Sequence, residues 1–302
     1  MRILITGGAG FIGSHVVEHY QGKAEIRVLD NLRTGYRSNL DGLDCEFIEA
    51  SILDQEALAQ AMEGVDYVFH LAALISVPES MERPHECAEL NINGLLNVLQ
   101  AAQAAQAKKL VLASSAAIYG DNPSVPKVES MTPEPRSPYA ITKLDGEYYC
   151  ELWQRENWLQ TACLRFFNVF GPRQDPNSAY AAAVPIFIDK ARKSETITIF
   201  GDGEQTRDFI YVKDIAAGLA YAAETESVTG AYNIGYGGSI RIKDLAKRIV
   251  EQTDSSSEIT YAPTRAGDVK HSSASADKLA ATGWRSQYGF EQGLSETLAA
   301  IP

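Results

Sequence analysis

The stretch ITGGAGFIGSH, residues 5–15, places Gly7, Gly10 and Gly13 between an apolar run and a helical pattern. The run before it, RILIT, has the length and apolar character of a buried strand. Glycines at this spacing let the backbone turn tightly and approach a pyrophosphate, while N–H groups at the helix N-terminus face its negative charge. The stretch therefore predicts a strand, a phosphate-binding turn and a helix.

A second strand, IRVLD, ends in Asp30, seventeen residues after Gly13. A carboxylate at this place can hold the ribose hydroxyls of an adenosine, and together with the glycine turn it predicts NAD as cofactor. The carboxylate disfavours the 2′-phosphate of NADP, although Arg33 lies close by in the sequence. The alternative is a glycine turn that serves packing alone.

Strand-length apolar runs alternate with helical segments through the first half of the chain. RILIT, IRVLD, CEFIEA, VDYVFHLA and KLVLASS are separated by stretches such as ALAQAME and LNINGLLNVLQAAQAAQ. This alternation predicts an α/β fold, a doubly wound parallel sheet of the Rossmann type covered by helices on both faces. TACLRFFNVF and GAYNIGY are expected to be further strands of the same sheet.

The sequence pattern changes near residue 170. There the long alternating strands and helices give way to the Pro- and Asn-rich stretch GPRQDPNSAY and then to short elements. We expect an NAD-binding domain over residues 1–169 and a smaller, mainly substrate-binding C-terminal lobe over residues 170–302. Segments at about 208–236 are expected to return to the first domain.

The composition excludes several classes of partner. The net charge is −12, from 27 basic and 39 acidic residues, and no basic run stands out, so we expect no nucleic-acid partner. No apolar run reaches the roughly 18 residues that span a bilayer, and the N-terminal run is too short for a signal peptide, so we expect no membrane association. Four scattered cysteines predict neither disulfides nor a metal site. A cytoplasmic location follows as an expectation.

His15 to His19 spell HVVEH, the order found in one class of zinc protease. Two histidines four residues apart share a helix face and could ligate zinc. The helix is already expected to pack beneath the glycine turn, however. We therefore interpret both as partly exposed helix histidines and predict no metal.

The stretch SPYAITK, residues 137–143, places Tyr139 and Lys143 one helical turn apart, because Ser137 can cap a helix and Pro138 suits its first position. Ionising a free tyrosine at pH 7 costs about 4 kcal/mol. A lysine ammonium, an oxidised nicotinamide and the positive helix end all favour the phenolate, which makes Tyr139 a candidate general base. Such a pair alone is more often an aromatic ring packed on an aliphatic stem.

The strand KLVLASS ends in Ser114 and Ser115, at the sheet edge where ligands bind. Ser115 lies 24 residues before Tyr139. With TGGAGFIG, DNL, SSxxxYG, YxxxK, RFFNVFGPRQDP and GDGxxxRDFxYVxD in order, nearly the whole chain resembles the extended short-chain dehydrogenase/reductase superfamily. The closest resemblance is to its NAD-dependent nucleotide-sugar epimerases and dehydratases. It implies Ser115, Tyr139 and Lys143 as the catalytic set.

The resemblance also implies a cofactor site. Its residues are Gly7, Gly10, Phe11, Ile12, Gly13, Asp30, Asn31, Ser51, Ile52, Leu71, Ala72, Ala73, Asn91, Tyr139, Lys143 and Phe166. Ser51 departs from the family, in which an aspartate commonly contacts adenine. Ile75 departs as well, since it stands where glucose-type epimerases carry a lysine near the cofactor.

The residues after Ser115 narrow the activity. The related 4,6-dehydratases carry an Asp-Glu pair there, and UDP-glucuronate decarboxylases a glutamate at the second place, but this chain has Ala116 and Ala117, which transfer no proton. What remains suits reversible C4 epimerisation of a UDP-hexose through a 4-keto sugar. The alternatives are a UDP-glucuronate decarboxylase or epimerase and, in a different class, a non-catalytic NAD-sensing protein, which typically lacks the tyrosine or lysine.

The same resemblance implies a UDP-sugar site in the second half. Arg207 and Arg265 match arginines that hold the diphosphate, Asp268 matches a residue for the nucleoside ribose, and Phe200 one for uracil. Asn168 matches a residue that contacts the sugar or the diphosphate. The matches for the sugar are Ser115, Ala182, Ala183 and Ser272. Ser272 matches a gatekeeper that is tyrosine in glucose-restricted epimerases, so space for an acetamido group predicts UDP-N-acetylglucosamine and UDP-N-acetylgalactosamine as substrates. Plain UDP-glucose and UDP-galactose remain open. Related proteins also imply a homodimer, paired through helices at about 89–105 and 138–156.

Overall fold

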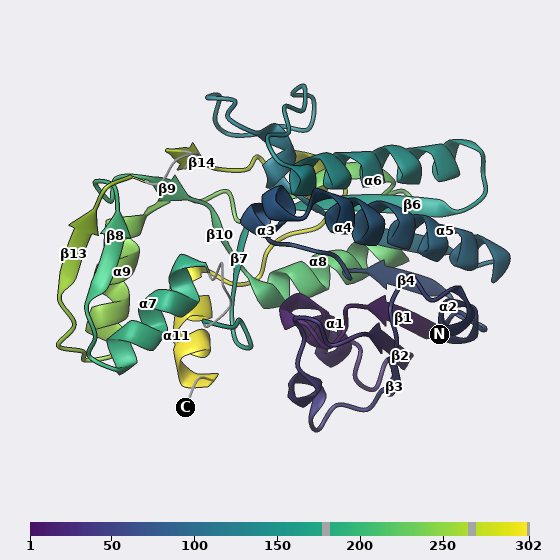
Figure 1. Ribbon diagram of the computed structural model, residues 1–302, viewed down its shortest axis with the longest axis horizontal. Coiled ribbons are helices and arrows are strands. Elements are labelled where there is room, and N and C mark those ends of the chain that lie inside the picture. The colour runs from purple at the N-terminus through teal and green to yellow at the C-terminus, as the bar shows by residue number, and fades with distance from the viewer. Residues whose placement is uncertain (177–181, 265–269, 301–302) are drawn as a thin grey trace.

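A computed structural model describes residues 1–176, 182–264 and 270–300 of the chain. Its centre is a seven-stranded sheet in the order β11-β6-β5-β4-β1-β2-β3, in which every neighbouring pair is parallel (Figure 1). The strands are β1 (Arg2–Thr6), β2 (Glu25–Asp30), β3 (Glu46–Glu49), β4 (Tyr67–His70), β5 (Lys109–Ser115), β6 (Gln160–Phe166) and β11 (Gly230–Ile234). The predicted doubly wound parallel sheet is confirmed.

Helices cover both faces of this sheet. One face packs against α1 (Phe11–His19) and α8 (Val212–Glu224), and the other against α2 (Gln55–Ala61), α5 (Gly94–Ala104) and α6 (Pro138–Arg155). Successive strand residues point to opposite faces, so Ile3 and Ile5 enter the first core and Leu4 the second. This double burial explains why the strands are continuous apolar runs.

Short helical segments connect the strands and precede α5 and α6. They are η1 (Arg37–Leu40), α3 (Val77–Glu82), α4 (Pro84–Ala88), the π-helical η2 (Glu89–Asn93) and η3 (Ala116–Tyr119). The π turn η2 lies inside a nearly continuous helix that runs from α4 into α5. Such turns often occur at functional sites.

A second body of elements lies to the left of the large sheet in Figure 1 and has its own apolar core. Its helices are α7 (Ala183–Arg192), α9 (Ile242–Gln252) and α11 (Phe290–Ala300), while α10 (Asp277–Ala281) lies next to β11. Its strands form small sheets: β8 (Ile197–Phe200) with β13 (Ile259–Ala262), and β12 (Ile240–Arg241) with β9 (Thr206–Arg207) and β14 (His271–Ser272).

The run TACLRFFNVF divides into two strands that go to different sheets. β6 lies in the large sheet, but β7 (Asn168–Phe170) pairs with β10 (Phe209–Tyr211) outside it. The prediction that the whole run joins the large sheet is therefore wrong for its last three residues, because the backbone of Asn168 bonds to Asp208 instead. The domain division at residue 169 stays a prediction.

Candidate active site

The glycine turn lies against the end of β4 and leaves no room for side chains. Gly7 has φ +73°, and a Cβ on it would lie 2.7 Å from the backbone nitrogen of Ala72. A Cβ on Gly13 would lie 2.2 Å from the carbonyl oxygen of Gly7. The turn is thus a bare backbone cradle at the start of α1, which is the surface that a dinucleotide pyrophosphate requires.

Asp30 ends β2 beside this turn. Its Oδ2 accepts a hydrogen bond from the backbone of Ala9 at 2.9 Å, and its Oδ1 accepts one from Leu32 at 2.8 Å. Burial raises the pKa of Asp30, while both backbone N–H groups lower it. The two bonds fix the carboxyl group in one orientation and leave each oxygen a further lone pair for ribose hydroxyls.

Arg33 is the basic residue near Asp30 that could have favoured NADP, and it is paired with carboxylates. Its guanidinium contacts Glu79 at 2.7 Å and Glu86 at 2.5 Å. Two anions thus neutralise the cation that a 2′-phosphate would need. The geometry around Asp30 and Arg33 fits NAD rather than NADP.

Most of the remaining cofactor candidates lie near the glycine turn. The carboxyl ends of β2, β3 and β4 are followed by Asn31, Ser51, Leu71, Ala72 and Ala73, and α1 begins with Phe11 and Ile12. Two other candidates are already bound within the fold. The side chain of Ile52 lies in the core, and its carbonyl oxygen accepts a hydrogen bond from the amide of Asn97 at 3.2 Å. The side-chain amide of Asn91 bonds to Leu74 and Thr142, which ties η2 to the tyrosine helix.

The structure brings the three predicted catalytic residues together at the end of β5. Ser137 caps α6 by accepting a hydrogen bond from Ala140 at 3.1 Å, which places Tyr139 in the first turn. The Ser115 hydroxyl lies near the Tyr139 phenol and lowers its pKa. The Nζ of Lys143 lies 5.8 Å from the centre of the Tyr139 ring and donates to the carbonyl oxygen of Ala113 at 2.8 Å.

The electrostatics of the protein alone do not ionise this phenol. Burial raises the pKa of Tyr139, and the nearby Ser115 hydroxyl lowers it in part. Burial also lowers the pKa of Lys143 to about 8, because the ammonium has lost water. A base at Tyr139 therefore needs further positive charge at the site, which fits the expected part of an oxidised nicotinamide.

The two residues that follow Ser115 carry no acid or base. Its hydroxyl accepts a hydrogen bond from the backbone of Ala117 at 3.1 Å, and Ala116 and Ala117 begin η3. Phe166 lies opposite Ser115 in the register of β5 and β6. The predicted nicotinamide neighbour and the predicted catalytic hydroxyl are therefore side by side.

The second body brings two of the predicted substrate residues into direct register. Ser272 on β14 pairs with Arg207 on β9, so the proposed gatekeeper lies beside a proposed diphosphate ligand. Phe200 lines a cavity of about 470 Å³. Asn168 begins β7, Ala183 begins α7 and Ala182 precedes it. Arg265 and Asp268 lie outside the described residues.

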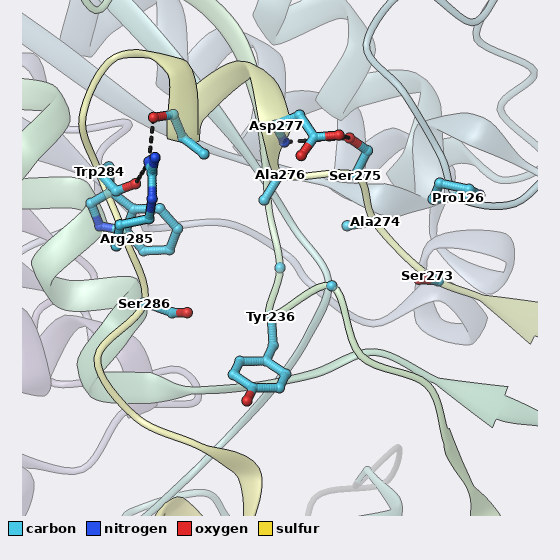
Figure 2. Close-up of a pocket in the computed structure, with 13 residues that line it drawn as sticks. Pro126, Tyr236, Ser273, Ala274, Ser275, Ala276, Asp277, Trp284, Arg285 and Ser286 are labelled. Carbon is cyan, nitrogen blue, oxygen red and sulfur yellow. Dashed lines mark hydrogen bonds between the residues drawn. The ribbon is translucent and has the colours of Figure 1, made fainter.

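Another cavity, of about 490 Å³, is lined by none of the predicted site residues. Figure 2 shows its walls, which come from the loop after β11 with Tyr236, from residues 273–277 and from residues 284–286. Asp208, the residue after Arg207, holds this region together. Its buried carboxylate accepts hydrogen bonds from the backbones of Tyr236, Gly237, Gly238 and Ala274. Sequence reasoning did not single out Asp208, although its place in the motif GDGxxxRDF could have drawn attention to it.

His15, from the pattern HVVEH, is buried rather than partly exposed, because it contacts the loop that follows β7. Its Nε2 lies 3.1 Å from the carbonyl oxygen of Pro172, and its Nδ1 lies 2.8 Å from Arg173. Across the part of the chain that the structure describes, no three His, Cys, Asp or Glu side chains gather as a metal site would require. Over the same residues, no helix has both the length and the apolar character needed to cross a bilayer.

Comparison with known proteins places this geometry among sugar-nucleotide enzymes. The structure resembles UDP-N-acetylglucosamine 4-epimerase from Methanobrevibacter ruminantium M1 in complex with UDP-N-acetylmuramic acid, with a TM-score of 0.96 and 38% identity over 99% of this chain and 97% of that one. It also resembles UDP-glucose 4-epimerase with UDP-glucose from Thermotoga maritima, with a TM-score of 0.95 and 39% identity over 100% and 98% of the two chains. A UDP-N-acetyl-alpha-D-glucosaminuronate decarboxylase from Bacillus cytotoxicus is 37% identical over 87% of this chain and 83% of its own.

Residues 3–235 match the model of the NAD dependent epimerase/dehydratase family. This match covers well over half of the chain and includes the glycine turn, Asp30 and the Ser115, Tyr139 and Lys143 set. The predictions of an NAD cofactor and of an enzyme are confirmed. The chain belongs to the NAD-dependent epimerase/dehydratase family, as its motifs predict.

Proposed function

We propose that this enzyme interconverts UDP-N-acetylglucosamine and UDP-N-acetylgalactosamine by inverting C4 of the sugar, and that it also accepts UDP-glucose and UDP-galactose. The coarser class, a UDP-sugar 4-epimerase, is supported by its family and by its likeness to two enzymes that carry such names. The observation that carries the finer proposal is the small Ser272 in register with Arg207. A serine there leaves space for an acetamido group and does not penalise a plain hydroxyl.

In this proposal Tyr139 acts as the base. Its phenolate accepts the proton of the sugar 4-hydroxyl and later returns it to the same oxygen, after the 4-keto sugar has turned its other face of C4 to the cofactor. Ser115 stays hydrogen-bonded to the phenol and relays or steadies the proton, while the ammonium of Lys143 favours the ionised form. NAD, when bound, would supply the acceptor for the C4 hydride and the source for its return, so the reaction would involve no net oxidation.

Epimerisation also demands a firm hold on the nucleotide and a loose one on the sugar, because the 4-keto sugar must present its other face. Arg207 is suited to the diphosphate, since a guanidinium donates two hydrogen bonds at once. Phe200 provides an aromatic face for uracil in its cavity. We assign Arg265 and Asp268 the diphosphate and ribose on their sequence positions alone.

A decarboxylase is the second candidate, favoured by the relative from Bacillus cytotoxicus. Ala117 disfavours a decarboxylase, because it stands where UDP-glucuronate decarboxylases are expected to have a glutamate. Incubation with UDP-glucuronate and with its N-acetylated counterpart tests it. Release of carbon dioxide with a pentose product would favour this candidate over the epimerase.

The deciding experiment is product analysis without added NAD. The purified enzyme is incubated separately with UDP-N-acetylglucosamine and UDP-glucose, and the products are separated by chromatography and identified by NMR. We expect C4 epimers from both. Ser272→Tyr should lower kcat/KM for the N-acetyl substrate at least about tenfold relative to UDP-glucose, because the ring fills the acetamido space. Conversion of neither sugar by the parent enzyme would overturn the assignment.

We also propose a homodimer formed through α5 and α6. Ile141 and Tyr148, two turns apart on α6, are 52% and 57% exposed. Apolar side chains on an exposed helix face suit burial against a second copy. Light scattering after gel filtration should give twice the monomer mass, and Ile141→Glu with Tyr148→Glu should give the monomer mass.

A further inference from the structure

A buried ion pair joins α6 to β6 directly behind the catalytic residues. The Nε and one terminal nitrogen of Arg165 donate to the two oxygens of Glu147, at 2.9 and 2.7 Å. The two side chains are only 6% and 7% exposed. Such a pair rarely stabilises a fold more than apolar residues of the same size would, because both charges have lost their water. Its presence therefore calls for a geometric explanation.

The pair is also bonded to the residue before Ser115. The hydroxyl of Ser114 donates to the Oε1 of Glu147 at 2.5 Å. Ser114 lies opposite Arg165 in the register of β5 and β6, and Glu147 follows Lys143 by one helical turn. One carboxylate thus connects the end of β5, the end of β6 and the helix that carries Tyr139 and Lys143.

The network extends to the residues after Ser115 as well. Arg165 donates to the Tyr119 hydroxyl at 2.8 Å, and that hydroxyl donates to the Oδ1 of Asn233 on β11 at 2.6 Å. Tyr119 ends η3, the short helix that Ser115 caps. The backbone is therefore fixed on both sides of Ser115, by Ser114 directly before it and by Tyr119 four residues after it.

We propose that Ser114, Glu147 and Arg165 are positioning residues, which hold the Ser115 hydroxyl at hydrogen-bond distance from the Tyr139 phenol and thereby set the rate of proton transfer. The proposal rests on the proposed function, in which Ser115 and Tyr139 act on the sugar hydroxyl. A displacement of about 1 Å between reacting groups can cost about 100-fold in rate. The network touches neither sugar nor cofactor in this scheme, so its loss should change kcat and leave KM alone.

The test uses a variant that removes the network without leaving a buried charge. Ser114→Ala, Glu147→Leu and Arg165→Met together replace it with apolar groups of similar size, a change that folded proteins commonly tolerate. Ser114→Ala alone is the milder second variant, which keeps the ion pair. Thr161→Val is the matched control: Thr161 also joins β6 to α6, through a 2.8 Å bond to Cys150, but lies outside the network.

We expect the triple variant to retain bound NAD and substrate KM while kcat falls about 10- to 100-fold, with a smaller fall for Ser114→Ala. The control should keep kcat even if its thermal midpoint drops. Crystal structures with NAD should show the bond between Ser115 and Tyr139 broken in the triple variant and kept in the control. A triple variant with full kcat, or with that bond intact, would overturn the proposal. If the triple variant does not fold, Ser114→Ala with unchanged kcat and an intact bond overturns it.

The crystal structures of the variants test this proposal independently of the proposed function. An unmodified enzyme that converts no UDP-hexose would reject the epimerase, whereas the bond between Ser115 and Tyr139 would still report whether the network positions it.

Discussion

The Nζ of Lys143 lies 5.8 Å from the centre of the Tyr139 ring and is held there by its bond to the carbonyl oxygen of Ala113. In the proposed mechanism the lysine therefore acts on the phenol through space, as a fixed charge. Because burial raises the pKa of the phenol and lowers that of the ammonium, this pair alone is not a strong base. Reactivity depends on what else is bound at the site.

The first prediction concerns the phenol itself. Tyr139→Phe should lower kcat about 10²- to 10⁴-fold, because the ring keeps its packing and loses the group that transfers the proton. The variant should still purify with NAD and unfold at the same temperature. The measurements are turnover with UDP-N-acetylglucosamine, cofactor released on denaturation and thermal unfolding. A variant with near-normal turnover would place the base elsewhere.

The second prediction concerns Asp30. Asp30→Asn should weaken NAD binding about 10- to 100-fold, because a charged acceptor for ribose hydroxyls is lost and one bond to Ala9 or Leu32 goes with it. Titration of the cofactor-free protein by calorimetry measures this. Arg33→Ala is the control and should leave NAD affinity nearly unchanged, since that guanidinium is occupied by Glu79 and Glu86. Equal NAD affinity for Asp30→Asn and the parent would contradict the assignment.

The third prediction concerns pH and the buried His70. Its Nδ1 lies 2.8 Å from the Thr6 hydroxyl, and burial, with a smaller contribution from Lys143, lowers its pKa to about 3. Between pH 6.5 and 3 the unfolded chain binds a proton at this residue that the folded chain refuses. The free energy of unfolding should therefore fall as the pH drops below 6.5, by at most about 1.4 kcal/mol per pH unit from this group.

Urea unfolding at several pH values from 4.5 to 7.5 measures this slope. His70→Asn keeps a polar partner for Thr6 but cannot titrate, so its stability should depend less steeply on pH over that range. At pH 7.5 the titration contributes nothing, and the two proteins then differ only by the packing change. Parallel curves for the parent and His70→Asn would show that the histidine titrates normally.

The sequence was most informative where one short segment contains the whole signal. The glycine turn, the capped start of α6 and the doubly buried strands each depend on neighbours within a few residues, so their places could be predicted. The pair between Glu147 and Arg165 could not, because it depends on the register of β5 and β6 and on how α6 crosses them. Arg165 stands inside an apolar run, and only the fold shows which carboxylate meets it.

The last prediction concerns another contact that only the fold reveals. Lys109 begins β5, is 1% exposed, and its Nζ donates to backbone carbonyls at the end of α8, among them Thr225 at 2.7 Å and Ala222 at 3.1 Å. The Ala222 carbonyl lies in the last turn of α8, where carbonyls run out of helical donors, while that of Thr225 also accepts a hydrogen bond from the backbone of Val228 at 3.1 Å. A cation there also suits the negative end of the helix dipole. Lys109→Met should therefore lower the free energy of unfolding by about 1 to 3 kcal/mol.

The preceding lysine provides a matched control. Lys108 forms an exposed ion pair with Asp66, and such pairs contribute little, so Lys108→Met should leave stability unchanged. Urea unfolding of both variants at one pH measures the difference between neighbouring lysines of identical chemistry. Since β5 also carries Ser115 at its other end, full turnover by Lys109→Met at low temperature would show that the contact stabilises the fold without shaping the site. Equal stability of the two variants would mean that the helix end is satisfied by water instead.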